Sequence, residues 1–98
     1  MIVSCVKYYH VGRGRLQALC NMEFKLGGVR MILSECKLYK KGDARWLSYP
    51  AKEFRASDGS KRWIPQFTFL STGDNDDFQA LALDAIDEYL ESERGYNG

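Results

Sequence analysis

The sequence has few of the residues on which metal and disulfide chemistry depend. It contains one histidine and three cysteines, and no two cysteines have the C-x-x-C spacing of zinc or redox sites. Because an odd number of cysteines argues against a disulfide scaffold, we expect Cys5, Cys20 and Cys36 to be buried free thiols. No apolar run approaches the ~20 residues of a membrane-spanning helix, and residues 1–7 have no secretory-signal pattern. These absences predict a cytoplasmic protein that does not enter a membrane.

The charge is nearly balanced overall but unevenly distributed. The 98 residues are enough for one small core, so we expect residues 1–98 to form a single domain. Residues 1–73 hold thirteen Lys and Arg against five Asp and Glu, whereas residues 74–98 hold one Arg against eight acids. Such asymmetry is typical of proteins that bind nucleic acid, and self-neutralisation within the folded molecule explains it equally well.

Three segments in the first half of the chain have the patterns of β-strands. Residues 2–9 are rich in Val, Ile and Tyr and end at the glycine-containing segment 10–14. Residues 16–26 alternate between apolar and polar, as in a strand with one buried face. Gly27-Gly28 favours a two-residue turn, because glycine adopts positive φ without a steric penalty, and the partner strand follows over residues 29–39.

Pairing across this turn predicts a register and one irregularity in it. The pairs on the shared apolar face are Leu26 with Val29, Phe24 with Met31, and Met22 with Leu33. Beyond Leu33 the apolar residues change sides, since Cys36 and Leu38 would point outward in the same register. We therefore expect a bulge near Ser34-Glu35 that restores the apolar face.

The middle of the chain is rich in turn-forming and charged residues. A polar turn over residues 40–43 leads into a short strand, 45–49, which Pro50 ends because it lacks an amide donor. Residues 50–61 are predicted to be a loop that reverses at Asp58-Gly59.

The last third predicts an edge strand and one helix. A strand is expected over residues 62–70, at an edge because of Pro65. A helix is expected over residues 76–93, introduced by capping residues 71–77 and stopped at Gly95. The residues of its apolar stripe are Phe78, Leu81, Ala82, Ala85, Ile86 and Tyr89.

Strands followed by one helix predict an α+β fold. In this fold the amphipathic C-terminal helix covers one face of a small, mostly antiparallel sheet. Because a sheet from so short a chain leaves free edges, we expect a homodimer formed through the sheets.

No set of residues has the pattern of a catalytic or metal site. His10 lies at a predicted strand end and is expected to be a surface residue. Residues 74–77 are oxygen-rich but lack the remaining positions of a calcium loop, so they are interpreted as helix-capping residues. We therefore expect no enzyme activity, no cofactor, no metal and no small-molecule substrate.

The densest basic stretch runs from Lys40 to Trp63 and interleaves cations with aromatic residues. Its candidate nucleic-acid-binding residues are Lys40, Lys41, Arg45, Lys52, Arg55, Lys61 and Arg62. Its aromatic residues are Trp46, Tyr49, Phe54 and Trp63. Cations neutralise phosphates and aromatic rings stack on unpaired bases, so the combination favours nucleic-acid binding. The alternative is that Trp46, Phe54 and Trp63 are core or loop anchors and the cations are merely solvated.

Several short motifs occur in an order that resembles one bacterial family. They are Gly14-Arg15-Leu16, an alternating strand with Ala18, Glu35-Cys36-Lys37-Leu38, Trp46-Leu47-Ser48-Tyr49-Pro50-Ala51-Lys52, Asp58-Gly59, Pro65 and Leu83-x-Ala85-Ile86-x-x-x-Tyr89. In this order they resemble the stage V sporulation protein G (SpoVG, septation regulator) family over most of the chain.

The resemblance implies a small α+β domain, a homodimer joined through its sheets, and regulatory nucleic-acid binding (DNA or RNA) without catalysis. By the same resemblance Lys52 takes the family's basic position after the proline. Glu53 stands where the family usually has a second basic residue, so we expect Arg55, Lys61 and Arg62 to share this contact.

Three functions therefore remain to be distinguished. The leading hypothesis is a homodimeric nucleic-acid-binding regulator. The second is a protein-interaction adaptor whose basic sheet pairs with an acidic helix or partner. The third is a coactivator-type single-stranded DNA binder.

Overall fold

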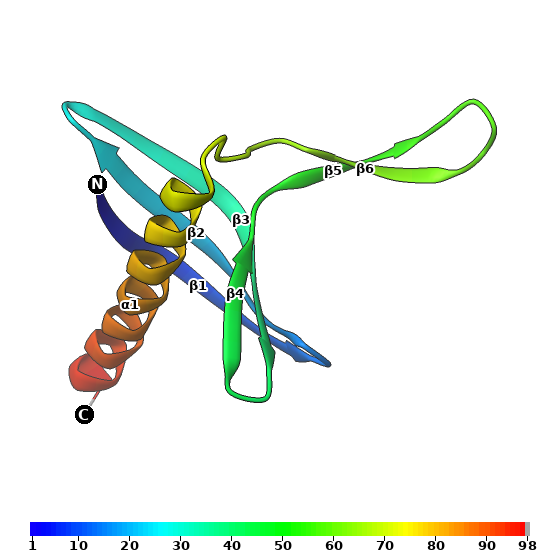
Figure 1. Ribbon diagram of the computed structural model, residues 1–98. Coiled ribbons are helices and arrows are strands. Elements are labelled where there is room, and N and C mark those ends of the chain that lie inside the picture. Colours follow the sequence, from blue (N-terminus) through cyan, green and yellow to red (C-terminus); the bar gives the residue numbers. More distant parts are fainter. Residues whose placement is uncertain (98) are drawn as a thin grey trace.

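The chain folds into a four-stranded antiparallel sheet, a separate two-stranded hairpin and a C-terminal helix (Figure 1). The computed structural model describes the backbone of residues 1–97 and the side chains of residues 1–93. The sheet has the order β1-β2-β3-β4, with β1 at Ile2–Arg13, β2 at Leu16–Leu26, β3 at Val29–Lys41 and β4 at Ala44–Ser48. The hairpin comprises β5 at Ala51–Arg55 and β6 at Lys61–Pro65, and the helix α1 spans Thr72–Asn97. The predicted α+β fold is confirmed.

The β2–β3 hairpin has the predicted turn, register and bulge. Gly27 has φ +59°, and all three predicted pairs of apolar residues lie opposite each other. Between Met22 and Cys20 the register shifts, so that one residue of β2 faces two residues of β3. Glu35 in this bulge has φ +59°, and its backbone N–H donates to Asn21 Oδ1 at 2.9 Å. The bulge turns Cys36 and Leu38 into the core, as predicted.

The first strand is longer than the sequence predicts. It continues past residue 9 to Arg13, since His10 still pairs with Ala18 and, after a register shift, Arg13 pairs with Leu16. Gly12 has φ +64°, and a Cβ atom there would lie 2.8 Å from His10 Nε2. His10 itself is exposed, as expected.

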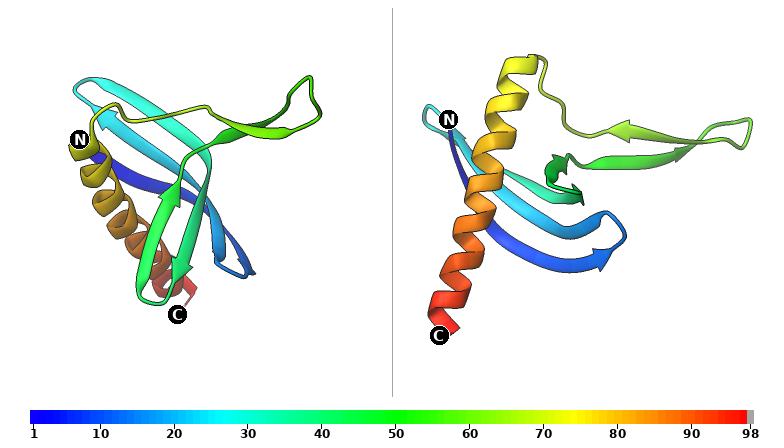
Figure 2. Two further views of the ribbon diagram at one scale, coloured as in Figure 1. Left: turned by 45° about the vertical axis from the view of Figure 1, so that its right-hand side comes forward. Right: turned by 60° about the horizontal axis from the view of Figure 1, so that its bottom comes forward.

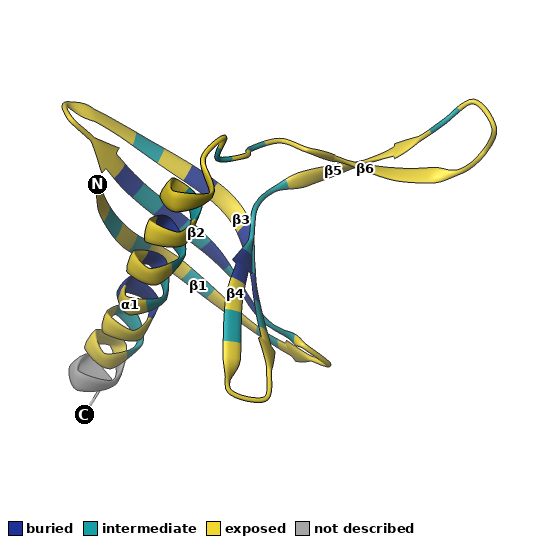
Figure 3. Cartoon of the chain, in the orientation of Figure 1, coloured by how far each residue is buried: buried dark blue, intermediate teal, exposed yellow. Residues whose placement is uncertain are grey.

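The core lies between one face of the curved sheet and α1 (Figure 3). Its buried residues are Ala18, Cys20, Met22, Phe24, Leu33, Cys36, Leu38, Leu47, Phe78, Ala82, Ala85 and Ile86. Leu81 was expected on the apolar stripe but is exposed, whereas Leu83 and Leu90 pack against the core. The free thiols Cys20 and Cys36 are buried as expected, and Cys5 is half-buried. Burial raises the pKa of Cys36 to about 11, so this thiol stays protonated at neutral pH.

The predicted strand over residues 62–70 is only partly correct. Strand β6 ends at Pro65, and the segment that follows returns to the body of the protein without entering a sheet. Phe67 and Phe69 anchor it, since their rings pack edge-on or tilted against Phe24 with centroid distances of 6.0 and 6.4 Å. After the Gln66 N–H, which donates to the Pro50 carbonyl at 2.9 Å, aromatic packing holds this segment in place.

The helix begins four residues earlier than predicted and does not stop at Gly95. The Ser71 side chain caps it, because Ser71 Oγ accepts from the Asp74 N–H at 3.3 Å. The helix backbone continues to Asn97. The Gln79 side chain of this helix binds the outer edge of β4. Its Oε1 accepts from the Leu47 N–H at 2.9 Å, and its Nε2 donates to the Leu47 carbonyl at 2.8 Å. A helix side chain thus satisfies backbone groups on a free sheet edge.

Residues 51–65 form a projecting hairpin, which we call the arm, where the sequence predicted a loop up to residue 61. Strands β5 and β6 pair with each other, and the reversal lies at Asp58-Gly59 as predicted, with Gly59 at φ +86°. Both views in Figure 2 show the arm extending away from α1. The radius of gyration is 15.0 Å, above the ~13 Å of a compact chain of this length. Within the part of the chain that the structure describes, α1 does not combine the length and the apolar character of a membrane-spanning helix.

Candidate nucleic-acid interface

The structure divides the seven predicted site residues between two places. Four of them belong to the arm, namely Lys52 and Arg55 on β5 and Lys61 and Arg62 on β6. The other three, Lys40, Lys41 and Arg45, lie around the β3–β4 turn. The β3–β4 turn lies at the end of β4 opposite the arm (Figure 1), so the seven residues form two groups.

The arm has two different faces, because side chains alternate along a strand. In the register of β5 and β6, Lys52 and Phe54 lie on one face with Ile64 and Arg62. The other face carries Glu53 and Arg55 with Trp63 and Lys61. All of these residues are exposed. Each face therefore offers cations next to an exposed aromatic ring.

Arg45 differs from the other predicted cations because it is bound to the helix. Its guanidinium donates two hydrogen bonds to the Asp87 carboxylate, at 2.8 and 2.9 Å. The Arg45 guanidinium lowers the pKa of Asp87 below its ordinary value. Arg45 thus joins β4 to α1 and is not available to a phosphate in this arrangement.

We expect Asp87→Asn to reduce stability slightly and only above acidic pH. The pKa of Asp87 is lowered in the folded state, so the ion pair stabilises the protein above the ordinary carboxyl value of 3.8 and is lost as pH falls through the lowered value. The two side chains are 32% and 50% exposed, so solvent screening limits the contribution to about 0.5 kcal/mol. Urea unfolding of both proteins at pH 7 and pH 3 measures it. A difference that is larger at pH 3 contradicts this prediction.

The arm cations are mostly free of ion pairs. Lys61 Nζ lies 3.6 Å from the Glu53 carboxylate, on the same arm face. Lys52, Arg55 and Arg62 form no ion pair with any residue whose side chain the structure describes. Among residues 1–93, therefore, Arg45 is the one predicted cation that the acidic helix neutralises.

The aromatic residues of the basic stretch are exposed, with Tyr49 as the exception. Trp46, Phe54 and Trp63 are 38%, 49% and 61% exposed, so none of them belongs to the core. Tyr49 is part-buried, and its hydroxyl donates to Asn75 Oδ1 at 2.5 Å. The interpretation of Trp46, Phe54 and Trp63 as core anchors is thus wrong.

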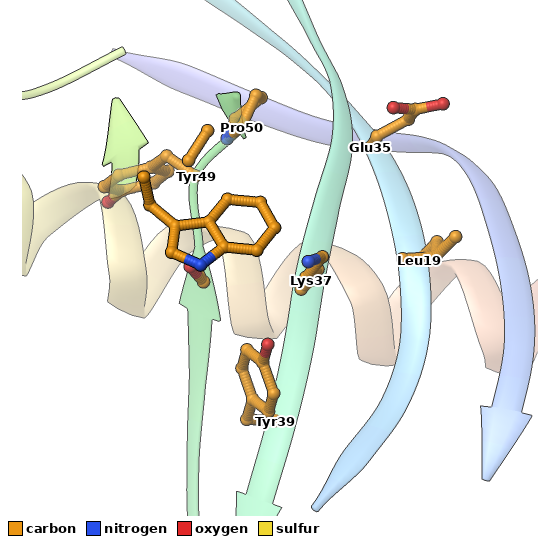
Figure 4. Close-up of a pocket in the computed structure, with 9 residues that line it drawn as sticks. Leu19, Glu35, Lys37, Tyr39, Tyr49 and Pro50 are labelled. Atoms are coloured by element: carbon orange, nitrogen blue, oxygen red, sulfur yellow. The ribbon is translucent and has the colours of Figure 1, made fainter. Parts of the chain in front are cut away.

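A groove of about 570 Å³ lies between the base of the arm and the sheet face that α1 leaves open (Figure 4). Its lining residues are Leu19, Glu35, Lys37, Tyr39, Ser48, Tyr49, Pro50, Ala51 and Trp63. Lys37 Nζ lies 5.4 Å from the centre of the Trp63 ring, at a cation–π distance.

Two groups of residues were missed at this interface. The groove residues Lys37 and Tyr39 belong to β3, and the strand alternation that buries Leu38 places them on the opposite face. Arg15 joins the basic β3–β4 end, since the Lys40 N–H donates to its carbonyl at 2.9 Å. The signal for Lys37 and Tyr39 is contained in the β2–β3 register. The position of Arg15 depends on how the β1–β2 turn packs against β3, which no local pattern contains.

The chain matches no family model, no curated protein and no solved structure. The resemblance to the SpoVG family therefore stays a prediction. Within the described residues, no three His, Cys, Asp or Glu side chains lie together as metal ligands would.

Proposed function

We propose that this chain is a nucleic-acid-binding protein, DNA or RNA, whose arm contacts phosphates. The observation that supports this most strongly is the position of Lys52, Arg55 and Arg62. They are exposed on a projecting hairpin, without ion pairs among the described side chains, on the side of the molecule away from the acidic helix. Free cations on an exposed ribbon attract phosphates and release their counterions.

The family resemblance supports the rest of this proposal. It favours a homodimer with a regulatory role and no catalytic activity, and a cytoplasmic location is a separate part of the proposal. Sedimentation velocity measures the oligomeric state directly, and a monomer at micromolar concentration contradicts the dimer.

We expect binding to weaken strongly with salt. If the four cations of the arm each neutralise one phosphate, the logarithm of the affinity falls with the logarithm of salt concentration with a slope of about −3 to −4. Fluorescence anisotropy with labelled single-stranded DNA, duplex DNA and RNA at several salt concentrations measures this slope. An affinity that does not depend on salt, or no binding at low salt, contradicts the proposed function.

The adaptor hypothesis also has one specific observation in its favour. Phe54 and Ile64 are exposed on the same arm face as Lys52 and Arg62, so this face fits an apolar surface bordered by acids. The helix of a second copy offers acidic side chains and the exposed Leu81. Charge reversal on the arm separates the two functions, since an adaptor loses its dimer and a nucleic-acid binder keeps it.

A further inference from the structure

The open face of the sheet carries a row of aromatic and basic side chains that leads into the groove. Tyr39 and Trp46 stack across β3 and β4, with ring centroids 5.8 Å apart and planes 20° apart. Lys37 follows on the same face of β3, two residues or about 7 Å along the strand. Trp63 of the arm lies over Lys37 at the end of this row.

We infer that the groove takes one unpaired base of a single-stranded nucleic acid, which stacks on the indole of Trp63. This inference rests on the proposed function and specifies which form of nucleic acid the protein prefers. The groove volume of about 570 Å³ lies within the ~300–1,000 Å³ of small-ligand sites. Trp63 remains 61% exposed despite its contact with Lys37, so much of its ring is free to stack.

The charges in and around the groove fit a neutral base inside and phosphates outside. Lys37 and Glu35 both line the groove and balance each other in formal charge. Glu35 is an acceptor for the exocyclic amino group of a base and repels a phosphate. On the arm, Lys61 lies two residues from Trp63 on the same strand face, and Arg55 is opposite Lys61. A strand with one base in the groove therefore has cations for its neighbouring phosphates along the arm.

A duplex cannot use the groove in this way. Its bases are stacked and paired, so it reaches the cations of the arm but places no base against Trp63 unless a base leaves the stack. The inference consequently predicts different effects of one substitution on two ligands.

The test compares Trp63→Ala with the unchanged protein by fluorescence anisotropy, using a single-stranded DNA oligomer and a duplex of the same length. We expect binding of the single strand to weaken about 5- to 100-fold and binding of the duplex to change less than about twofold. Tyr9→Ala is the matched control, because Tyr9 is an exposed aromatic residue on β1 that neither belongs to the arm nor lines the groove, and it should leave both affinities unchanged. Trp63→Phe should recover part of the affinity, because a smaller aromatic ring still stacks.

An abasic oligomer provides a second measurement that does not depend on the variant's folding. It keeps the phosphates and lacks the bases, so the unchanged protein should bind it about as weakly as Trp63→Ala binds the normal oligomer. Equal affinity for normal and abasic oligomers, or equal losses for single strand and duplex, overturns the inference and leaves phosphate binding by the arm intact. Binding of no nucleic acid at low salt instead overturns the proposed function. If Trp63→Ala converts a dimer into monomers in sedimentation velocity, the groove belongs to the contact between copies, and the inference is wrong.

Discussion

Phe24→Ala is expected to lower the free energy of unfolding by about 3–5 kcal/mol. Phe24 is buried on β2, and its ring meets the rings of Phe67, Phe69 and Phe78 at centroid distances of 6.0, 6.4 and 5.4 Å. Truncation leaves a cavity at the point where the sheet, the segment after the arm and α1 meet. Total stabilities of about 5–15 kcal/mol are usual, so the loss is a large fraction of the whole. Urea unfolding followed by circular dichroism, at one protein concentration, measures it.

Phe54→Ala is the matched control for this prediction, because the same side chain is removed from an exposed position on the arm. We expect a change within about 0.5 kcal/mol there. A loss below about 1 kcal/mol for Phe24→Ala shows that the aromatic cluster is not packed as described.

The β2–β3 hairpin could be predicted in detail because its sequence pattern is strict and local. A two-residue turn fixes the register, and alternation then identifies the place where Cys36 and Leu38 must change face. The helix was predicted for the same reason, although its start was misplaced by four residues because the Ser71 cap lies before its first acidic residues.

The arm could not be predicted as a hairpin because both of its faces are exposed. Its strands carry charged and apolar residues on the same face, such as Lys52 with Phe54, so no alternation distinguishes them from a loop. The contact of Arg45 with Asp87 was missed for a different reason. It joins residues 42 positions apart and depends on where α1 crosses β4, which no local pattern contains.

The candidate site was therefore predictable in composition and not in arrangement. The densest basic and aromatic stretch does contain the arm, and its cations are exposed. The groove beneath the arm also needs β3, because Lys37 and Tyr39 come from a strand that ends ten residues before the arm begins. A stretch of sequence thus identifies the cations, and the fold adds the surface on which a base can stack.

Reversal of Lys52, Arg55 and Arg62 to glutamate is expected to weaken nucleic-acid binding by about 100-fold or more. These are the arm cations without ion pairs among the described side chains, and each charged hydrogen bond to a phosphate contributes about 1.5 kcal/mol or more. The salt dependence should also fall, with a slope less steep by about 3. Anisotropy titrations at 50 and 150 mM salt measure both effects.

The matched control reverses Arg15, Lys40 and Lys41, which changes the net charge by the same amount at the other basic end of the sheet. Screening acts over ~8 Å at physiological salt, so this distant reversal should weaken binding less than about tenfold at 150 mM. Equal losses for the two triple variants mean that net charge rather than the arm determines binding.

The oligomeric state of the arm variant decides between the remaining functions. Loss of nucleic-acid binding with an intact oligomer supports phosphate contact by the arm, whereas dissociation into monomers supports the adaptor, because the arm then holds a partner chain.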